Sequence, residues 1–599
     1  MFLFRIKGEK TSVSMTQNRI STIFFVIIVL VLPIMFTGCL AYSMDQGKHR
    51  SIPAVQAGGE SMDTDGDVDG AEADPRDEEL AKELAQEEEK RRALEERQKL
   101  EEMRKEELGA FYVPLPPLEQ RENPPVKARG IYLTGNTVGH SRFRDLINMV
   151  ETTELNAVVI DVKNDHGKIT YNSQIELVEE LDAHLSAPIK DLKAILDELH
   201  EKGIYPIARI VVFKDPYLAE LKPEWSIQKN SGGLWRDRNG VAWINPYEKK
   251  VWDYNIAVAR EVALLGFREI QFDYIRFPEN AHLLDREAYY PGEDLPKEEV
   301  IRDFLVYAAE QLQDYNVYLS ADVFGVIATS WGDSDRIGQA WEAMSPHVDY
   351  ICPMVYPSHY GKGYFGFSVP DAHPGETVEF ALTDALKRNA ALKDPAIIRP
   401  WLQSFTATSW VPGAIPYGPA EIRAQIEAAM ELGIDEYLLW NASNRYQPAS
   451  LKTAEEADNL FSSLSRSREE AGEDSLGRTP QRAVELFLEA LQKKDWKEAY
   501  TLQVTDHKLD HLSYPDWKDA WVMKPVFYKV SPPGEDVRTA GEPLLVNLNV
   551  RLSGEESELE LVHESWEVKM ENRLWRVRPS AKFLELLIGN HPDSDENVT

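Results

Sequence analysis

Two aspartates stand inside apolar runs, where a carboxylate needs a partner or a use. Asp273 lies in EIQFDYIRF and Asp322 lies in NVYLSADVFG. A lone carboxylate in an apolar strand is unfavourable by several kcal/mol. Two carboxyl groups on neighbouring elements can act as nucleophile or base and as acid across a glycosidic bond. We therefore take Asp273 as the candidate nucleophile and Asp322 as the candidate acid/base.

Further polar and aromatic side chains follow similar apolar runs. Carboxylates and amides can bind sugar hydroxyls, and aromatic rings can stack on the apolar faces of sugars. Strand alternation predicts that Asp161, Lys163 and Asp165 share one face, and that Tyr274 points away from Asp273 and packs. The candidates for substrate binding are Asp161, Lys163, Asp165, Arg209, Arg276, Tyr356, His359, Trp401, Gln403, Trp440 and Asn441.

Each candidate also has a structural interpretation. Asp273 could form an ion pair with Arg276 or with Arg209. Asp322 could cap a helix or brace a loop. The other carboxylates could brace a neighbouring lysine, and the two tryptophans could belong to the core. Residue type alone leaves these alternatives open.

Other catalytic patterns are missing from the sequence. It contains no H-x-H or H-E-x-x-H zinc motif, no G-x-S-x-G and no Walker A loop. GKGYFG (361–366) matches G-x-G-x-x-G, but the segment after it does not open a helix. We therefore expect no cofactor and no metal. A weaker alternative is a metal-dependent hydrolase that uses Asp161, Asp165 and Asp273.

Eight β-branched runs alternate with amphipathic stretches, which predicts parallel strands joined by crossover helices. This pattern predicts a (β/α)8 barrel, whose chemistry lies at the carboxyl ends of the strands. The alternative is an open doubly wound sheet, but the first run lacks the Gly-rich turn of that fold. Neighbouring strands lie about 4.8 Å apart, a spacing that favours a retaining mechanism for Asp273 and Asp322. The runs are 128–135, 156–165, 204–213, 269–277, 316–325, 349–357, 396–405 and 435–443.

The same region resembles the glycoside hydrolase-like domain called DUF4015. The resemblance rests on ARGIYLTG, VVIDVKND, YPIARIVVFKDP, AWINPYEKKVWDYN, EIQFDYIRFP, SADVFG, CPMVYPSHY, RPWLQSF and LLWNASNRY, in this order. It implies a glycosidase-like barrel. In similar barrels an Asp that ends strand four is commonly the nucleophile, and Asp273 is the matching position. Many relatives carry a Glu on strand five, where this chain has Asp322, so the resemblance leaves the acid/base role open.

The N-terminus has the layout of an export signal. Basic residues precede the apolar run ISTIFFVIIVLVLPIMFTG, and Cys39 follows it. The ending FTGC resembles a bacterial lipobox, so residues 1–39 are predicted to be a lipoprotein-type signal with lipidation at Cys39. An uncleaved signal-anchor is the alternative. Either way, we expect a membrane-attached protein at the outer face of the cytoplasmic membrane or in the cell envelope.

Shifts in composition predict the remaining domain boundaries. Residues 40–76 are acidic and Gly-rich, as in a disordered tether. Residues 77–125 combine a charged helix with a Pro-rich linker, and the sparse apolar spacing favours a solvated helical spacer over a coiled coil. The barrel should span 126–460, followed by a linker (461–477). An α+β domain at 478–590 resembles the NTF2-like fold in its pattern of helices followed by strands.

The charge balance narrows the class of partner. The chain has 66 Lys and Arg against 100 Asp and Glu, a formal net charge of −34, which argues against nucleic acid. We expect a polysaccharide or oligosaccharide substrate, cleaved by a two-carboxylate mechanism. The rival hypothesis is a catalytically inactive carbohydrate-binding or envelope scaffold protein. It would keep the aromatic residues without a working carboxylate pair. The oligomeric state stays open.

Overall fold

The computed structural model describes most of the chain, and the longest segment outside it is 1–74. The described residues are 75–333, 335–504, 524–531, 543–553 and 558–587. The chain divides into two compact units, Met1–Lys82 and Glu83–Thr599, and only the start of one helix is described in the first. The predicted signal, the lipidation site Cys39 and nearly all of the predicted tether lie outside the described residues.

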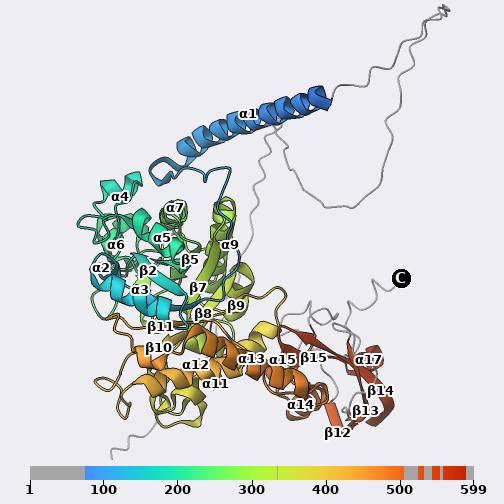
Figure 1. Cartoon of the computed structure of the whole chain (residues 1–599). Coiled ribbons are helices and arrows are strands. Elements are labelled where there is room, and N and C mark those ends of the chain that lie inside the picture. Colours follow the sequence, from blue (N-terminus) through green and yellow to red (C-terminus); the bar gives the residue numbers. More distant parts are fainter. Residues whose placement is uncertain (1–74, 334, 505–523, 532–542, 554–557, 588–599) are drawn as a thin grey trace, which may run out of the picture. The chain divides into compact units, whose positions relative to one another are not determined.

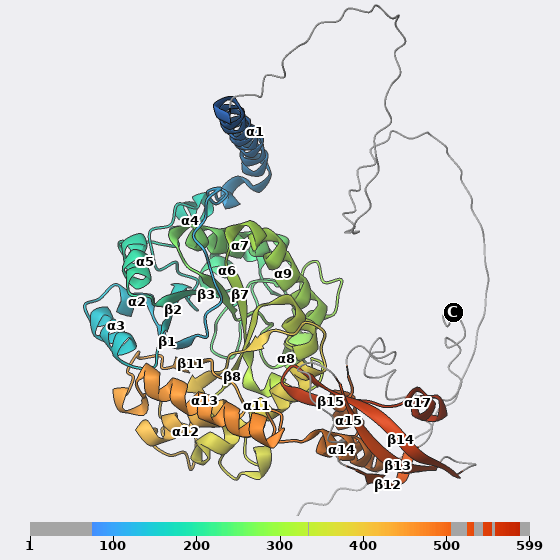
Figure 2. The same cartoon turned by 45° about the vertical axis from the view of Figure 1, so that its right-hand side comes forward.

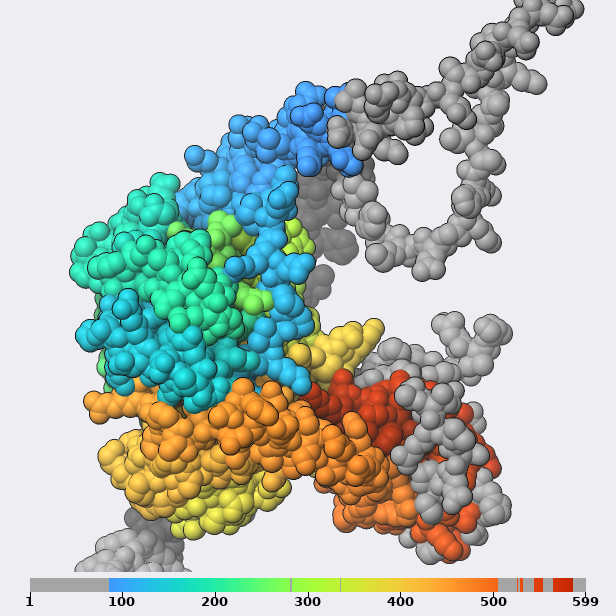
Figure 3. All heavy atoms as spheres, in the orientation of Figure 1, coloured from blue at the N-terminus to red at the C-terminus, as the bar shows by residue number. Residues whose placement is uncertain are grey.

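The predicted strands close into a barrel because each pairs in parallel with its neighbours (Figure 1). The eight strand positions are β1 (Arg129–Leu133), β2 (Ala157–Lys163), β3 (Tyr205–Val211), β5 (Glu269–Asp273), β7 (Tyr318–Phe324), β8 (Tyr350–Val355), β9 with β10 (Ile397–Ile398 and Trp401–Gln403) and β11 (Tyr437–Trp440). Strand β1 pairs with both β2 and β11, so the first and last strands meet. Figure 3 shows the blue-green surface of the first part of the barrel beside the orange surface of its last part. The predicted (β/α)8 barrel is confirmed, and the open sheet is wrong.

Helices cover the outer face of the barrel (Figure 2). Local signals mark several helix starts: Asp191 accepts a hydrogen bond from the Ala194 amide, and Thr453 and Glu456 form a capping box. The longer helices are α3 (Arg142–Thr152), α5 (Leu192–Glu201), α7 (Lys249–Leu265), α9 (Lys297–Leu312), α11 (Pro374–Ala390), α12 (Pro419–Glu431) and α13 (Ala454–Ala471). Shorter ones are α2 (Gly135–Val138), α4 (Glu176–Glu180), α6 (Pro216–Leu221), α8 (Ala281–Glu287) and α10 (Trp341–Met344).

Side chains alternate along the barrel strands between two apolar clusters. In β2, Val158 and Ile160 face the helices and belong to the main core, whereas Ala157 and Val159 face the barrel interior. This period of two directs Asp161 inward, because it has the parity of the interior residues. The loops between strands also hold one small antiparallel pair, β4 (Gln228–Lys229) with β6 (Ala288–Tyr289).

A buried ionic cluster fills the amino-terminal end of the barrel. The guanidinium of Arg399 lies 2.8 Å from both carboxylate oxygens of Glu269 and 2.9 Å from Glu436. The same guanidinium lies 3.5 Å from the ring centroid of Tyr350. Glu269 begins β5 and Glu436 directly precedes β11, so the cluster occupies the end of the barrel opposite the carboxyl ends of the strands.

The N-terminal helix and the C-terminal α+β segment have the predicted secondary structure, whereas residues 461–471 of the predicted linker belong to helix α13. Helix α1 (Pro75–Leu108) carries mostly exposed side chains, with ion pairs such as Arg92–Glu88 at 2.7 Å. The C-terminal region has helices α14 (Pro480–Lys493), α15 (Trp496–Leu502) and α17 (Ala581–Leu587). Its antiparallel sheet contains β12 (Lys524–Val530), β13 (Leu544–Ser553), β14 (Glu558–Glu571) and β15 (Leu574–Arg578). Among the described residues, none of the helices is both long enough and apolar enough to cross a membrane. The NTF2-like resemblance stays a prediction.

Candidate active site

A cleft of about 410 Å³ opens at the carboxyl ends of the barrel strands. Residues from β3, β5, β7, β8, β10 and β11 line it, so its walls come from most of the barrel. In TIM barrels this end is where catalytic residues lie. The predicted site residues that line the cleft are Arg209, Asp273, Arg276, Asp322, Tyr356, His359, Trp401 and Trp440.

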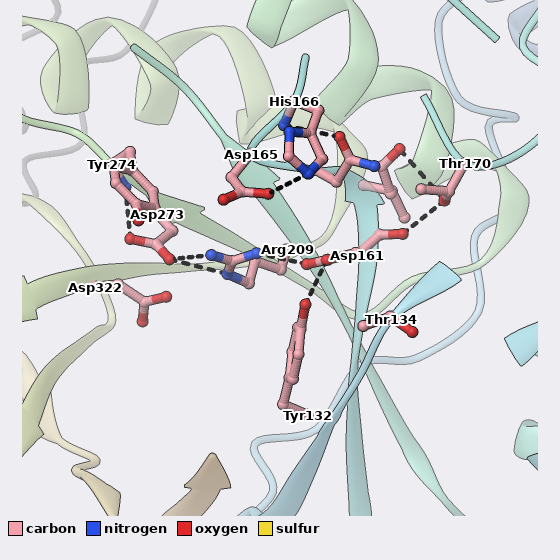
Figure 4. Close-up of polar contacts among 12 residues, drawn as sticks. Tyr132, Thr134, Asp161, Asp165, His166, Thr170, Arg209, Asp273, Tyr274 and Asp322 are labelled. Carbon is pink, nitrogen blue, oxygen red and sulfur yellow. Dashed lines mark hydrogen bonds and ion pairs between the residues drawn. The ribbon is translucent and has the colours of Figure 1, made fainter. Parts of the chain in front are cut away.

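Asp273 is the last residue of β5, and a buried arginine holds its carboxylate (Figure 4). The Nε of Arg209 donates to Asp273 Oδ2 at 2.9 Å, and Nη2 contacts the same oxygen. The other oxygen, Oδ1, accepts a hydrogen bond of 2.5 Å from the Tyr274 amide. Asp273 therefore pairs with Arg209, one of the two partners considered from the sequence, and its position is fixed on both sides.

Arg209 is shared between two aspartates. Its Nη1 donates to Asp161 at 2.5 Å, and the second oxygen of Asp161 accepts a hydrogen bond of 2.6 Å from the Tyr132 hydroxyl. Burial alone would lower the pKa of Arg209, but Asp273 and Asp161 raise that pKa well above its usual value. The chain Tyr132–Asp161–Arg209–Asp273 thus fixes a charged guanidinium behind the candidate nucleophile (Figure 4).

Asp322 occupies a different electrostatic environment on the neighbouring strand β7. Burial raises its pKa well above the ordinary value, and the nearby charge of Asp273 raises it further. The indole N–H of Trp401 donates to Asp322 Oδ1 at 2.7 Å. Asp322 is thus held by an indole donor in a buried site, whereas Asp273 is paired with a guanidinium. Such a difference between two carboxyls is the usual basis for assigning acid and nucleophile.

The two aspartates lie at the same level of adjacent strands. The register of β5 with β7 pairs Gln271 with Ser320 and Phe272 with Ala321, so the next residues are Asp273 and Asp322. Both have the parity that faces the barrel interior, and Figure 4 shows Asp322 beside Asp273. The pairing of β5 with β7 has no stagger as far as Phe272 and Ala321. The prediction of a retaining mechanism assumed such an unstaggered pair of strands.

Aromatic rings form the walls beside this pair. The ring of Trp440 stacks on Tyr132, with centroids 4.0 Å apart, and meets Trp401 edge-on at 5.5 Å. At the end of β8, Tyr356 meets the ring of His359 at 5.3 Å. Burial, with added effects of Asp322 and Asp273, raises the pKa of the Tyr356 hydroxyl, which therefore stays protonated. The cleft combines carboxyls, hydroxyl and imidazole groups with flat apolar surfaces.

Comparison with known families gives an independent result for the same region. The family DUF4015, described as "Putative glycosyl hydrolase domain", matches residues 130–446. The chain belongs to the DUF4015 family. The match covers nearly the whole barrel, including both candidate carboxylates, and it confirms the resemblance found in the sequence.

Solved structures similar to this chain include proteins of several kinds. A hypothetical protein from Ruminiclostridium thermocellum ATCC 27405 is 42% identical, covering 32% of this chain and 97% of that chain, with a TM-score of 0.30. The PgaB (BpsB) glycoside hydrolase domain from Bordetella bronchiseptica is 14% identical over 56% and 98% of the two chains, with a TM-score of 0.39. The spore cortex-lytic enzyme SleL from Bacillus megaterium QM B1551 is 14% identical over 56% and 75%, with a TM-score of 0.34. No curated protein matches the chain.

Lys163 of the DUF4015 barrel does not share a face with Asp161, so the predicted alternation is wrong at this point. In the pairing of β2 with β3, Asp161 lies opposite Arg209, but Lys163 lies opposite Ile210. One extra residue of β2 therefore stands against β3, which is a β-bulge. The bulge reverses the side to which Lys163 points.

The ammonium group of Lys163 is buried between the barrel and helix α7. It lies 2.8 Å from the carboxylate of Asp215 and donates to the Val211 carbonyl at 2.7 Å. The ring centroid of Tyr254 in α7 is 5.5 Å away. Lys163 therefore braces the end of β3 and does not line the cleft.

Asp165 also lies outside the cleft lining. Its half-exposed carboxylate accepts a hydrogen bond from Lys214 at 3.1 Å. The carboxylates of Asp161, Asp165 and Asp273 do not converge, because Arg209 lies between the first and the last (Figure 4). Among the described residues, no group of three or more His, Cys, Asp or Glu side chains has metal-site geometry. The alternative of a metal site on these three aspartates lacks the required arrangement.

Gln403 and Asn441 do not line the cleft either. Gln403 is fully buried: its amide donates to Asp371 and to the Phe405 carbonyl, each at 3.0 Å, and its oxygen accepts from the Ser358 amide at 3.0 Å. The amide of Asn441 donates to the backbone carbonyl of Ser404 and to a second carbonyl in its own loop. Both residues hold loops in place.

Arg276 lines the cleft without contacting Asp273. Its guanidinium donates to Glu279 at 3.2 Å and to the Phe277 carbonyl at 3.1 Å, and it lies 4.4 Å from the ring centroid of Phe324. Burial lowers the pKa of Arg276, and among the described residues its ion pair is with the exposed carboxylate of Glu279. The sequence alternative of an Asp273–Arg276 ion pair is therefore wrong.

Tyr274 is a cleft residue that strand alternation misplaced. It has φ +51°, so the chain leaves the extended conformation directly after Asp273, and its ring lines the cleft. Lys214 donates to its hydroxyl at 3.3 Å. Strain of this kind in a non-glycine residue is common at functional sites. The other lining residues that were not predicted come from the ends of β7 and β8 (Phe324 and Met354) and from the segments that follow the strands (Glu279, Gly325, Val326 and Tyr360).

Proposed function

We propose that the DUF4015 domain of this chain hydrolyses glycosidic bonds in an extracellular or cell-envelope polysaccharide by a retaining two-carboxylate mechanism. One observation carries the proposal. Two aspartates at the same level of adjacent strands share one cleft, but one is paired with an arginine and the other has a raised pKa. Two carboxyls in such different surroundings can take the separate roles of nucleophile and acid that this chemistry requires.

In the first step, the carboxylate of Asp273 attacks the anomeric carbon and forms a glycosyl ester. Asp322 donates its proton to the glycosidic oxygen as the bond to the leaving sugar breaks. In the second step, Asp322 takes a proton from water, and the oxygen of that water attacks the anomeric carbon. The ester bond breaks, the sugar leaves with retained configuration, and Asp273 is again a carboxylate.

The surrounding groups hold the reacting atoms in place. Arg209 and the Tyr274 amide bind the Asp273 oxygens, and Trp401 orients Asp322. Such fixed contacts reduce the reorganisation needed to reach the transition state. We propose that Tyr356, His359, Trp440 and Arg276 contact the sugar. Asp161 affects the reaction through its ion pair with Arg209, which it holds in place beside Asp273.

We propose that the protein works outside the cytoplasmic membrane. The basic and apolar layout of residues 1–39 supports export, and the ending FTGC supports a lipid anchor on Cys39. A retained signal-anchor would place the barrel on the same side. Metabolic labelling of the expressed protein with a fatty acid, with Cys39→Ala as control, separates the two.

The test of the activity is a screen of the purified protein against α- and β-linked polysaccharides, with release of reducing ends as the readout. We expect cleavage of at least one glycan, with retained configuration at the new anomeric centre by NMR. Asp273→Asn should lower the rate by about 10³-fold or more, because no ester can form. Full activity in Asp273→Asn would overturn the assignment.

A second candidate function has one observation in its favour. Both oxygens of Asp273 already accept hydrogen bonds within the chain, which suits a structural ion pair in a carbohydrate-binding or envelope scaffold protein. In that case the wild type and Asp273→Asn would bind the same glycan, and neither would cleave it. Calorimetric titration with the glycans of the screen distinguishes the two functions.

A further inference from the structure

One tryptophan near the cleft is exposed to solvent. Trp410 lies in the loop between β10 and α12, and 54% of its surface is exposed. Among the tryptophans whose burial the structure describes, it is the only one with more than half of its surface exposed. A large indole surface in water is unfavourable, and its burial against a ligand is correspondingly favourable.

Trp410 adjoins the cleft through a residue that lines it. Its ring lies 5.5 Å from the ring of His359, at an angle of 80°. His359 in turn meets Tyr356 at 5.3 Å, and both His359 and Tyr356 line the cleft. The three rings form a continuous wall that leads from beside the candidate carboxylates to solvent.

A buried network holds the Trp410 loop against the segment of His359. The carboxylate of Asp371 accepts hydrogen bonds from the Ile415 amide at 3.1 Å and from the Gln403 side chain at 3.0 Å. Gln403 also accepts from the amide of Ser358, the residue before His359, at 3.0 Å. Asp371 and Gln403 are both fully buried, so the loop has a rigid base.

We propose that Trp410 forms an outer sugar-binding subsite. Its indole stacks on the apolar face of a hexopyranose ring that lies beyond the cleft, on the side of His359. The inference rests on the proposed function and deepens it: the substrate is an oligosaccharide or polysaccharide that extends past the reacting bond. Gln403 and Asp371 are positioning residues for this subsite.

The subsite predicts a dependence on chain length. The test compares wild type, Trp410→Ala and Trp410→Tyr on oligosaccharides, from disaccharide to hexasaccharide, of the glycan cleaved in the screen. Trp410→Ala should lower kcat/KM about tenfold for the longer substrates, through KM, and leave the disaccharide unchanged. Trp410→Tyr should restore most of the loss, because it keeps a ring. Tyr289→Ala, an exposed aromatic outside the cleft lining, is the matched control.

The positioning residues have their own readout. Gln403→Leu should raise KM more for the longer oligosaccharides than for the disaccharide, as Trp410→Ala does. A loss of equal size at every length would show a general effect on the fold. An unchanged KM would show that the network does not position Trp410.

The outcomes separate the subsite from the hydrolase. If Trp410→Ala and wild type have equal kcat/KM on oligosaccharides of every length, the subsite is overturned and the proposed hydrolase function stands. If the wild type cleaves nothing, calorimetric titration with cello-, chito- and galacto-oligosaccharides decides. Weaker binding by Trp410→Ala than by wild type would then support the subsite, although the proposed hydrolase function fails. Equal binding by the two proteins, or no binding, would overturn both the subsite and the hydrolase function.

Discussion

At the scale of single residues, the site depends on two aspartates with the same chemistry and different neighbours. Asp273 faces a guanidinium that is itself fixed by Asp161, whereas Asp322 is buried beside the charge of Asp273 and a single indole N–H. Arg209 forms an ion pair with Asp273, whereas burial raises the pKa of Asp322. The roles we propose therefore follow from the neighbours and not from the residue type.

Asp322→Asn should stabilise the protein at neutral pH. The pKa of Asp322 is raised in the fold, so the native state binds its proton more tightly than the unfolded state, and wild-type stability falls as pH rises above the unfolded pKa. The amide removes this fall and still accepts from Trp401. We expect a gain of about 1 kcal/mol in the free energy of unfolding at pH 8 and a smaller gain at pH 5, by urea denaturation.

Asp273→Asn is the matched variant, and it should behave in the opposite way. It weakens the pairing of the buried Arg209, so we expect a loss of about 3 kcal/mol in the free energy of unfolding. Equal effects of the two substitutions would contradict the difference between their environments.

The acid role of Asp322 predicts a specific pH dependence. Because the proton donor must be protonated, kcat/KM should fall as pH rises through the raised pKa of Asp322. Asp322→Asn should lose about 10²–10⁴-fold on a natural glycan, but much less in the glycosylation step of a nitrophenyl glycoside. The check is the burst of nitrophenol release. Equal losses on both substrates would assign the proton to another group.

At the scale of elements, the bulge in β2 separates a structural lysine from the site. Lys163→Met should lower the free energy of unfolding by about 3–5 kcal/mol, because Asp215 would stay buried without its ion pair. The activity per folded molecule should be unchanged, as measured at a temperature where the variant is folded. A loss of activity in the folded variant would place Lys163 in the site.

The double variant Lys163→Met with Asp215→Asn is the control for this prediction. Removing both charges of a buried pair is far less destabilising than removing one. The Asn side chain can still accept from the Leu218 amide, as Asp215 does in capping α6 at 2.8 Å. Stability should therefore return most of the way toward that of the wild type.

At the scale of the whole barrel, the two ends have different tasks. The ionic cluster of Arg399, Glu269 and Glu436 fills the amino-terminal end, while the cleft opens at the other. Arg399→Met should lower the free energy of unfolding by about 3–5 kcal/mol, since two glutamates would remain buried. KM and the pH profile should stay unchanged below the melting temperature. A shifted pH profile would show that the cluster is coupled to the site.

Much of the barrel could be predicted from local pattern. Every observed barrel strand lies within its predicted run, because β-branched alternation and burial are properties of short segments. The positions of Asp273 and Asp322 near the ends of strands four and five follow from the same pattern. The direction of the Tyr274 side chain could not be predicted, because its positive φ breaks the alternation where the strand ends.

The sequence alone determined the order of the strands, the type of barrel and the two carboxylates on neighbouring strands. Only the tertiary structure decided that Arg209 lies between Asp161 and Asp273, that Lys163 turns outward and that Trp410 meets His359. Periodicity is a local property that each segment carries by itself. Ion pairs, raised pKa values and ring contacts depend on residues far apart in the chain, and only the closed barrel brings them together.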